Sequence, residues 1–187
     1  MDPADQSSAA AFAFAHERCA LIRNASFVQA LTRARANGII RSGVALTPIS
    51  PQALREYGAQ WTAAHWTGAG GWQWNVLARR FTRKPRSFHA ALWSGSRLCG
   101  LCVGRLSKGR KHLTLHYMES APDPAHPLRG VVTLLMFEAA RNYGTAMGAD
   151  KLLLREPLPG VVARYENFGF RLAQGAYGLV YFERILD

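Results

Sequence analysis

The sequence is poor in cysteine: its 187 residues include only Cys19, Cys99 and Cys102. Three thiols cannot form a disulfide framework of the kind that supports small secreted domains. Cys99 and Cys102 have the C-x-x-C spacing of redox and zinc sites, but no second pair follows. They fall within an expected strand, where residues three apart point to opposite faces. We therefore expect reduced thiols in a strand rather than a metal or redox centre.

Long hydrophobic runs are also missing. No stretch approaches the roughly 20 apolar residues that span a bilayer. The N-terminal segment MDPADQSSAAAFAFAHERC begins with acidic residues, and charged side chains end its apolar run, unlike in a signal peptide. We expect no membrane segment, a cytoplasmic location, and a loose tail that leads into a helix at about residue 17.

Acidic residues are absent between Glu56 and Glu119, although the net charge of the chain is +11. Such a one-sided surface attracts phosphorylated ligands or polyanions, whether nucleic acid, nucleotide cofactor or acidic protein. A solvated basic surface that only aids solubility is the alternative. The basic residues in this region, 79–111, are Arg79, Arg80, Arg83, Lys84, Arg86, Arg97, Arg105, Lys108, Arg110 and Lys111.

The length and the 49% hydrophobic composition suit one domain with a substantial core. Ser50 and Pro51 predict a helix start, and Pro85 predicts the end of a short basic helix. Alternating patterns predict an antiparallel three-stranded meander. Because strands joined by turns pair antiparallel and those joined through a helix pair parallel, the central sheet should be mixed. The meander strands are expected at 87–93, 97–106 and 112–119.

The last third of the chain predicts helix, strand, helix and hairpin. An amphipathic helix is expected within 128–148, and the strand within 150–157 is expected to be buried on both faces. The next helix ends in YENFGF, where Gly169 can adopt the left-handed conformation and Phe170 can fold back onto the last turn. A hairpin within 170–185 closes the chain.

This order of elements, together with the YENFGF ending, resembles the GCN5-related N-acetyltransferase (GNAT) superfamily over about residues 44–185. The resemblance implies an α/β (α+β) fold with a mixed, mostly antiparallel central sheet of six to seven strands, flanked by helices. Residues 1–40 would form an N-terminal tail and helix packed on the domain, and 41–187 the acyltransferase domain. It also implies an acyl-CoA-dependent N-acyltransferase, most simply an N-acetyltransferase, that uses acetyl-CoA or another acyl-CoA as co-substrate and no metal.

The resemblance implies where coenzyme A would bind. The pantetheine arm would bond to the backbone of the strand HLTLHYMES, near Tyr117 and Met118. The pyrophosphate would meet the loop before the next helix, at Arg129, Gly130 and Val131. This placement is physically sensible, because free amides and the helix dipole favour an anion at a helix N-terminus.

Two departures from the family's pattern concern the same cofactor. Val131 and Val132 stand where a second glycine is expected in the phosphate loop, and a β-branched pair narrows the approach of the phosphate. Leu158 takes the approximate place of an asparagine that often contacts the cofactor in the family.

The resemblance also suggests the catalytic residues. Tyr165 would be the general acid that protonates the leaving thiolate, although it could instead be a core residue. Glu119 would be the general base, unless it caps a turn or pairs with an arginine. His116 is the second candidate base because its ordinary pKa suits proton transfer near neutrality. His112 and His116 could suggest a metal pair, but no third ligand is evident.

The acceptor is the least constrained partner. Aromatic residues interleaved with arginines can stack on bases and neutralise phosphates, which suggests an anionic acceptor such as an aminoacyl-tRNA or a protein. Core and lid packing of the tryptophans is the simpler alternative. Small cationic amines are disfavoured because residues 57–118 hold no acid. The alternative function is a catalytically weak GNAT-fold module that binds nucleic acid or an acidic partner. The oligomeric state could be a monomer or a homodimer. The tryptophans are Trp61, Trp66, Trp72, Trp74 and Trp93.

Overall fold

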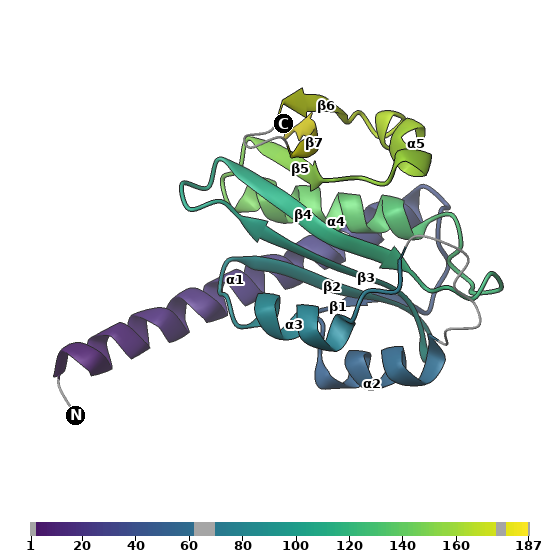
Figure 1. Cartoon of the computed structure of the whole chain (residues 1–187). Coiled ribbons are helices and arrows are strands. Elements are labelled where there is room, and N and C mark those ends of the chain that lie inside the picture. The colour runs from purple at the N-terminus through teal and green to yellow at the C-terminus, as the bar shows by residue number, and fades with distance from the viewer. Residues whose placement is uncertain (1–2, 62–69, 175–178, 187) are drawn as a thin grey trace.

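The computed structural model describes residues 3–61, 70–174 and 179–186, and forms one seven-stranded sheet with helices on both faces (Figure 1). The strand order is β1-β2-β3-β4-β5-β7-β6. Among the described strands only β4 and β5 pair in parallel, and every other neighbouring pair is antiparallel. The mixed, mostly antiparallel sheet expected from the sequence is therefore confirmed. The strands are β1 (Val44–Thr47), β2 (Ser87–Ser94), β3 (Arg97–Leu106), β4 (His112–Ser120), β5 (Lys151–Arg155), β6 (Arg171–Gln174) and β7 (Val180–Ile185).

The helices divide the core into two layers. α1 (Pro3–Ala36) and α4 (Val132–Ala146) pack against each other and cover one face of the sheet, while α2 (Pro51–Gln60) and α3 (Trp74–Thr82) cover the other. A short 3₁₀ turn, η2 (Pro159–Val161), leads into α5 (Val162–Glu166), which packs on the α4 side. Apolar side chains from both faces of the sheet thus have helices to bury them.

Local sequence signals account for several helix ends. The Ser50 hydroxyl accepts a hydrogen bond of 3.2 Å from the Ala53 amide, and Pro51 occupies the first helical position of α2. Gly169 has φ +79°, and the Phe170 amide donates back to the Tyr165 carbonyl at 3.2 Å. Both signals that we identified in the sequence are therefore confirmed.

The N-terminal helix is longer than the sequence analysis predicted. α1 begins at Pro3, in place of a loose tail that becomes helical at about residue 17. The segment between is rich in alanine, which has the highest intrinsic helix propensity. From residue 10 on, where burial is described, the first buried residue is nevertheless Cys19. The first part of α1 consequently projects past the sheet (Figure 1).

Two expectations about the strands, one on pairing and one on burial, were wrong. β1 and β2 are separated in sequence by two helices, yet they pair antiparallel; two helices in succession let the chain return in either direction. β5 is buried on one face and half-buried on the other, rather than buried on both. It lies next to the point where the sheet opens, so the side chains on one face lack full cover.

A β-bulge changes the interpretation of Cys99 and Cys102. The β2–β3 register shifts at Leu92 and Trp93, so Cys99 and Cys102 lie on the same face, within the α1–α4 core, rather than on opposite faces. Burial raises the pKa of both thiols. Within the described ranges no three metal-ligating side chains gather, and no described helix has the length and apolar character to cross a membrane.

Candidate active site

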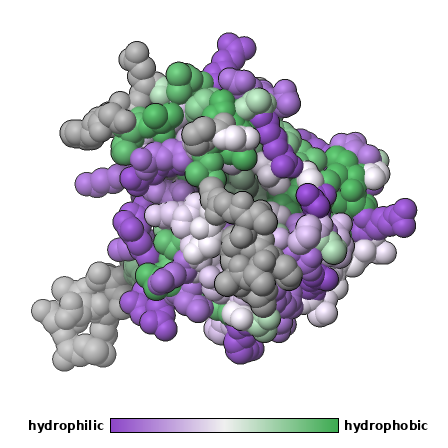
Figure 2. All heavy atoms as spheres, turned by 45° about the vertical axis from the view of Figure 1, so that its right-hand side comes forward, coloured by the Kyte–Doolittle hydropathy of each residue, from purple (hydrophilic) through white to green (hydrophobic). Residues whose placement is uncertain are grey.

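A pocket of about 410 Å³ opens where β4 and β5 separate. The two strands pair only as far as Leu115 and Leu154, while β4 continues to Ser120. Tyr117 lines the pocket from the α2–α3 side of the sheet, and Tyr165 lines it from the α1–α4 side. The pocket therefore runs between two strands of one sheet, along a stretch of β4 that lacks a β5 partner. Figure 2 brings this side forward and shows hydrophilic and hydrophobic residues intermixed.

Most of the site residues expected from the sequence line this pocket. The structure brings five of them together there, namely His116, Tyr117, Met118, Glu119 and Tyr165. The other three, Arg129, Gly130 and Val131, lie in the loop that leads into α4, whose first residues also line the pocket.

A second β-bulge in β4 places the candidate bases on one side. The β3–β4 register shifts between Val103 and Gly104, which oppose Tyr117 and Leu115 and leave His116 as the extra residue. The His116 and Tyr117 rings both lie near Phe81 of α3, at centroid distances of 5.4 and 6.5 Å. In a regular strand, residues three apart point to opposite faces, so His116 and Glu119 would lie on different sides of the sheet. The bulge places both on the α2–α3 side.

Glu119 is buried and holds the start of α3. Its Oε2 accepts from the Trp74 indole N–H at 2.5 Å, and its Oε1 accepts from the Gly71 amide at 2.6 Å. Burial raises the pKa of the Glu119 carboxyl, and these hydrogen bonds oppose the rise. Since each carboxylate oxygen can accept more than one hydrogen bond, Glu119 keeps acceptor capacity for a further donor.

His116 is held in its neutral form. Burial, reinforced by the positive charges of Arg155, Arg105 and Arg80, lowers the pKa of its imidazole to about 4. A group with so low a pKa is unprotonated near neutrality, but it binds a proton weakly. His116 is therefore a poorer match for a base at neutral pH than Glu119, whose pKa is displaced upwards.

Tyr165 combines core packing with access to the pocket. Its ring lies 5.5 Å from the Phe137 ring and 6.5 Å from the Phe170 ring, centroid to centroid. Burial raises the pKa of its phenol, against the opposing charge of Arg164. Tyr165 thus stays protonated at neutral pH and can donate a proton, while the packing of its ring fixes its position.

The loop before α4 presents the features of an anion site. Gly130 has φ +88°, and a Cβ built there would meet nothing within 4 Å. Val131 precedes α4 without any side-chain cap, so the first amides of the helix lack a side-chain acceptor. Arg129 is exposed, and Arg164 donates to the Gly130 carbonyl at 2.6 Å. A diphosphate would suit this helix start, because the first amides of α4, the helix dipole and the guanidinium groups of Arg129 and Arg164 all favour an anion there.

The valines of this loop turn largely into the core. Val132 is only 3% exposed, and its Cγ1 would lie 2.6 Å from a Cβ at Gly100 of β3. Val131 is half-buried and packs on the α1–α4 core. Val132 is accommodated because Gly100 lets α4 approach the sheet closely.

The tryptophans serve mainly as packing. Trp61, Trp74 and Trp93 are buried, and their indole N–H groups donate to Leu98, Glu119 and Thr47 respectively. Trp72 is half-buried and lines the pocket beside Tyr117, with ring centroids 5.3 Å apart. Trp66 lies outside the described residues. Because they are buried, these three indoles cannot stack on the bases of a nucleic acid.

Sequence reasoning missed two arginines of the site. Arg155 ends β5 and Arg164 lies in α5, and both line the pocket. A basic residue in the last turn of a helix is usually read as compensation of the helix dipole, so Arg164 gave no separate signal. Only its position next to Tyr165 could have suggested it. The partnership of Glu119 with Trp74 had no sequence signal, because 45 residues separate them.

Comparisons with protein-family profiles and with curated proteins found no match. Solved structures do match. The ribosomal-protein-S18-alanine N-acetyltransferase from Escherichia coli aligns with a TM-score of 0.58 at 15% identity, over 77% of this chain and 94% of that one. The PaiA N-acetyltransferase from Thermoplasma acidophilum, in complex with coenzyme A, aligns with a TM-score of 0.52 at 14% identity, over 76% and 98%. An acetyltransferase of the GNAT family from Streptococcus pneumoniae gives a TM-score of 0.55 at 13% identity, over 77% and 99%. These likenesses, at low identity, establish the architecture: the chain has the fold of the GNAT superfamily.

Proposed function

We propose that the protein is an acyl-CoA-dependent N-acyltransferase, most simply an N-acetyltransferase, that transfers an acyl group directly to a primary amine. One observation carries the proposal: the pocket runs between β4 and β5, with the candidate acid and base on its two sides and an uncapped helix start at its edge. The solved structures with this fold include N-acetyltransferases, one of them with coenzyme A bound.

The residues present fit an acyl-CoA. The β4 backbone beyond Leu115, which has no β5 partner, offers hydrogen-bonding groups to a pantetheine arm, near Tyr117 and Met118. Arg129, Arg164 and the first amides of α4 would hold the diphosphate. Bound there, the acyl-CoA would supply an activated thioester carbonyl. No other cofactor is required by these residues.

The chain's own residues divide the proton transfers between them. Glu119, directly or through a water molecule, takes a proton from the attacking amine, and Tyr165 donates its phenolic proton to the sulfur that leaves. The amine nitrogen gains a bond to the acyl carbon as the carbon–sulfur bond breaks. His116 is the alternative base, and its low pKa makes it the weaker one.

The acceptor that suits this site is an anionic molecule. Arg155, Arg105 and Arg80 are close enough to His116 to lower its pKa, so the acceptor side of the pocket has a positive potential. The α3 region adds four more exposed basic residues, Arg79, Arg83, Lys84 and Arg86, and like Arg80 none of them pairs with an acid among the described residues. A negatively charged protein segment or an aminoacylated RNA carries an amine together with compatible charge.

Release of coenzyme A thiol from acetyl-CoA tests the proposal, with acidic peptides, aminoacylated tRNA and polyamines as acceptors. We expect release that depends on an acidic or nucleic acceptor and falls by about 10²-fold or more in Tyr165→Phe. Glu119→Gln should fall similarly, while His116→Asn should keep most activity. The opposite ranking of Glu119 and His116 would identify the histidine as the base. Binding of RNA without any acyl-CoA binding would favour the non-catalytic module.

A further inference from the structure

Positive side chains surround His116 in a way that the proposed proton transfers do not require. Strands β4 and β5 stop pairing just before His116 and Arg155, so these are the first residues beyond the point where the strands separate. Both residues line the pocket. Two further arginines, Arg105 of β3 and Arg80 of α3, are close enough to act on the same imidazole. Three guanidinium groups from three different elements therefore gather at one position on the pocket wall.

Arg105 approaches this position across the ring of Phe81. Its guanidinium carbon lies 5.5 Å from the centroid of the Phe81 ring, and the His116 ring lies 5.4 Å from the same ring, centroid to centroid. The half-buried Arg105 forms no ion pair with a described acid, and its buried Nε has no hydrogen-bond partner within the described ranges. Buried polar groups normally find a partner, because an unused donor costs free energy. Arg105 thus has an unused donor for an anion.

Arg80 and Arg155 add positive charge on the same side of the sheet. Arg80 directly precedes Phe81, is exposed, and pairs with no acid in the part of the chain that the structure describes. Arg155 is shared with its neighbour, since its Nε donates to Oε2 of Glu156 at 3.0 Å. Even with Glu156 and Glu119 both ionised, the three arginines leave an excess of positive charge.

We propose that Arg105, Arg80 and Arg155 form an anion subsite for the acceptor, with His116 as its floor. The subsite would hold a carboxylate or phosphate of the same molecule whose amine reaches the catalytic carboxylate. This inference rests on the proposed function, because the subsite belongs to the same pocket. It narrows the acceptor from an anionic molecule in general to an amine with an anionic group at a defined distance.

The geometry of β4 sets that distance. His116 and Glu119 lie three positions apart, and the bulge at His116 places both on the same side of the sheet. At about 3.3 Å per residue, their Cα atoms lie no more than about 10 Å apart. A small molecule such as ε-aminocaproate can place its amine and its carboxylate at the two ends of such a span. Guanidinium groups bind carboxylates and phosphates through paired, charge-assisted hydrogen bonds, so the subsite would select for such a group.

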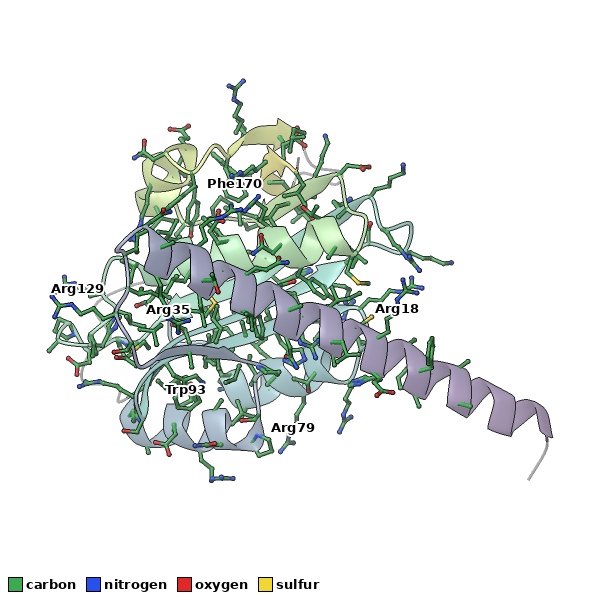
Figure 3. All side chains as sticks on the ribbon, turned by 180° about the vertical axis from the view of Figure 1, so that it is seen from behind. Arg18, Arg35, Arg79, Trp93, Arg129 and Phe170 are labelled. Carbon is green, nitrogen blue, oxygen red and sulfur yellow. The ribbon has the colours of Figure 1, made fainter. Side chains whose placement is uncertain are left out.

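Acceptors that differ in one charge test the subsite. Initial rates of acetyl transfer are measured with ε-aminocaproate and with its neutral amide, which has the same length and the same amine. We expect kcat/KM to be about tenfold or more higher for the carboxylate, mainly through a lower KM. Arg105→Gln should reduce this preference to less than about twofold. The matched control is Arg18→Gln, which removes an exposed arginine from α1, on the other face of the sheet (Figure 3), and should keep the preference.

A phosphonate acceptor identifies which anion the subsite prefers. Aminobutylphosphonate enters the same assay, and a preference for it over ε-aminocaproate would assign the subsite to phosphate, whereas the reverse order would assign it to a carboxylate. Equal values of kcat/KM for both anionic acceptors and the neutral amide would overturn the proposal.

A binding measurement separates failure of the subsite from failure of the proposed function. Inorganic phosphate is titrated into the full chain, and the His116 imidazole, assigned through His116→Asn, is followed by NMR. We expect a saturable shift and a rise in the pKa of the imidazole, because a nearby anion favours its charged form. Arg105→Gln should weaken phosphate binding about tenfold or more, while Arg18→Gln should bind as the wild type does.

The outcomes of this titration are distinct. A His116 signal that follows ionic strength alone, or equal phosphate binding by Arg105→Gln and the wild type, would overturn the subsite whether or not acetyl-CoA binds. A saturable, Arg105-dependent response in a chain that does not bind acetyl-CoA would refute the proposed function alone.

Discussion

Replacing Gly100 with alanine tests how closely α4 must approach the sheet. The added Cβ would lie 2.6 Å from Cγ1 of Val132 and 3.4 Å from the Glu119 carbonyl oxygen. A β-branched side chain in a helix has one preferred rotamer, so Val132 cannot turn aside cheaply. Overpacking of this kind costs about 1–3 kcal/mol. For a chain of this length the midpoint of thermal unfolding should fall by about 2–12 °C, at about 2–4 °C per kcal/mol.

The contact between position 100 and Val132 should also couple the effects of the two substitutions on stability. Val132→Ala alone should also destabilise, by about 1–3 kcal/mol, because it removes two methyl groups from a buried site. Val132→Ala also removes the atom that the added Cβ of Gly100→Ala would meet. The double variant should therefore lose less free energy of unfolding than the sum of the two single variants, by about 1 kcal/mol. Gly58→Ala in α2 is the control: its Cβ meets nothing within 4 Å, and alanine should stabilise the helix by about 0.5–1 kcal/mol.

Urea unfolding of the four proteins, the wild type, both single variants and the double variant, measures these free energies. Strictly additive costs, or a neutral Gly100→Ala, would refute the close packing of α4 on β3. Because α4 also carries the proposed phosphate site at its N-terminus, Gly100→Ala should weaken acetyl-CoA binding too.

Three further predictions concern single groups. Gly169→Ala forces φ +79° on a residue with a Cβ and should cost about 1–2 kcal/mol in urea unfolding; an unchanged midpoint would exclude the left-handed helix end. Trp74→Phe removes a donor to Glu119, so the pKa of Glu119 should rise further and stability should fall by about 1–3 kcal/mol; NMR titration of the carboxyl would reveal a wrong sign. His89 is buried and neutral, with a pKa of about 3, so its contribution is present above its unfolded pKa of about 6.5 and declines as pH falls towards 3. Unfolding free energies of His89→Gln should fall less steeply over that interval; equal slopes would contradict the assignment.

Much of the fold followed from local patterns in the sequence. The meander strands, the start of α2 at Ser50 and the glycine end of α5 each depend on residues close in sequence, and each was predicted. The extent of α1 was not predicted, because its first part has few packing contacts and only alanine propensity indicates it. The β1–β2 pairing also escaped prediction, since helix-connected strands are usually parallel and no local residue signals the reversal.

Part of the pocket lining was predicted from the sequence, but neither its arginines Arg155 and Arg164 nor its geometry was. The resemblance supplied Tyr165 and Glu119, which line one pocket. The bulge at His116 has no sequence signature, yet it decides that His116 and Glu119 share a side of the sheet. The hydrogen bond from Trp74 to Glu119 joins residues distant in sequence, and single-sequence patterns carry no information on such contacts.

Thermal unfolding with excess acetyl-CoA tests the central claim, the acyl-CoA site between β4 and β5, most directly. At 100 times the dissociation constant, binding should stabilise the wild type by about 2.7 kcal/mol, or about 5–11 °C. Tyr165→Phe should keep that rise. Arg129→Ala combined with Arg164→Ala should lose most of it, whereas Arg171→Ala, an exposed arginine on β6 that does not line the pocket, should keep it. An unchanged midpoint in the wild type, with acetyl-CoA and with longer acyl-CoA forms, would contradict the account.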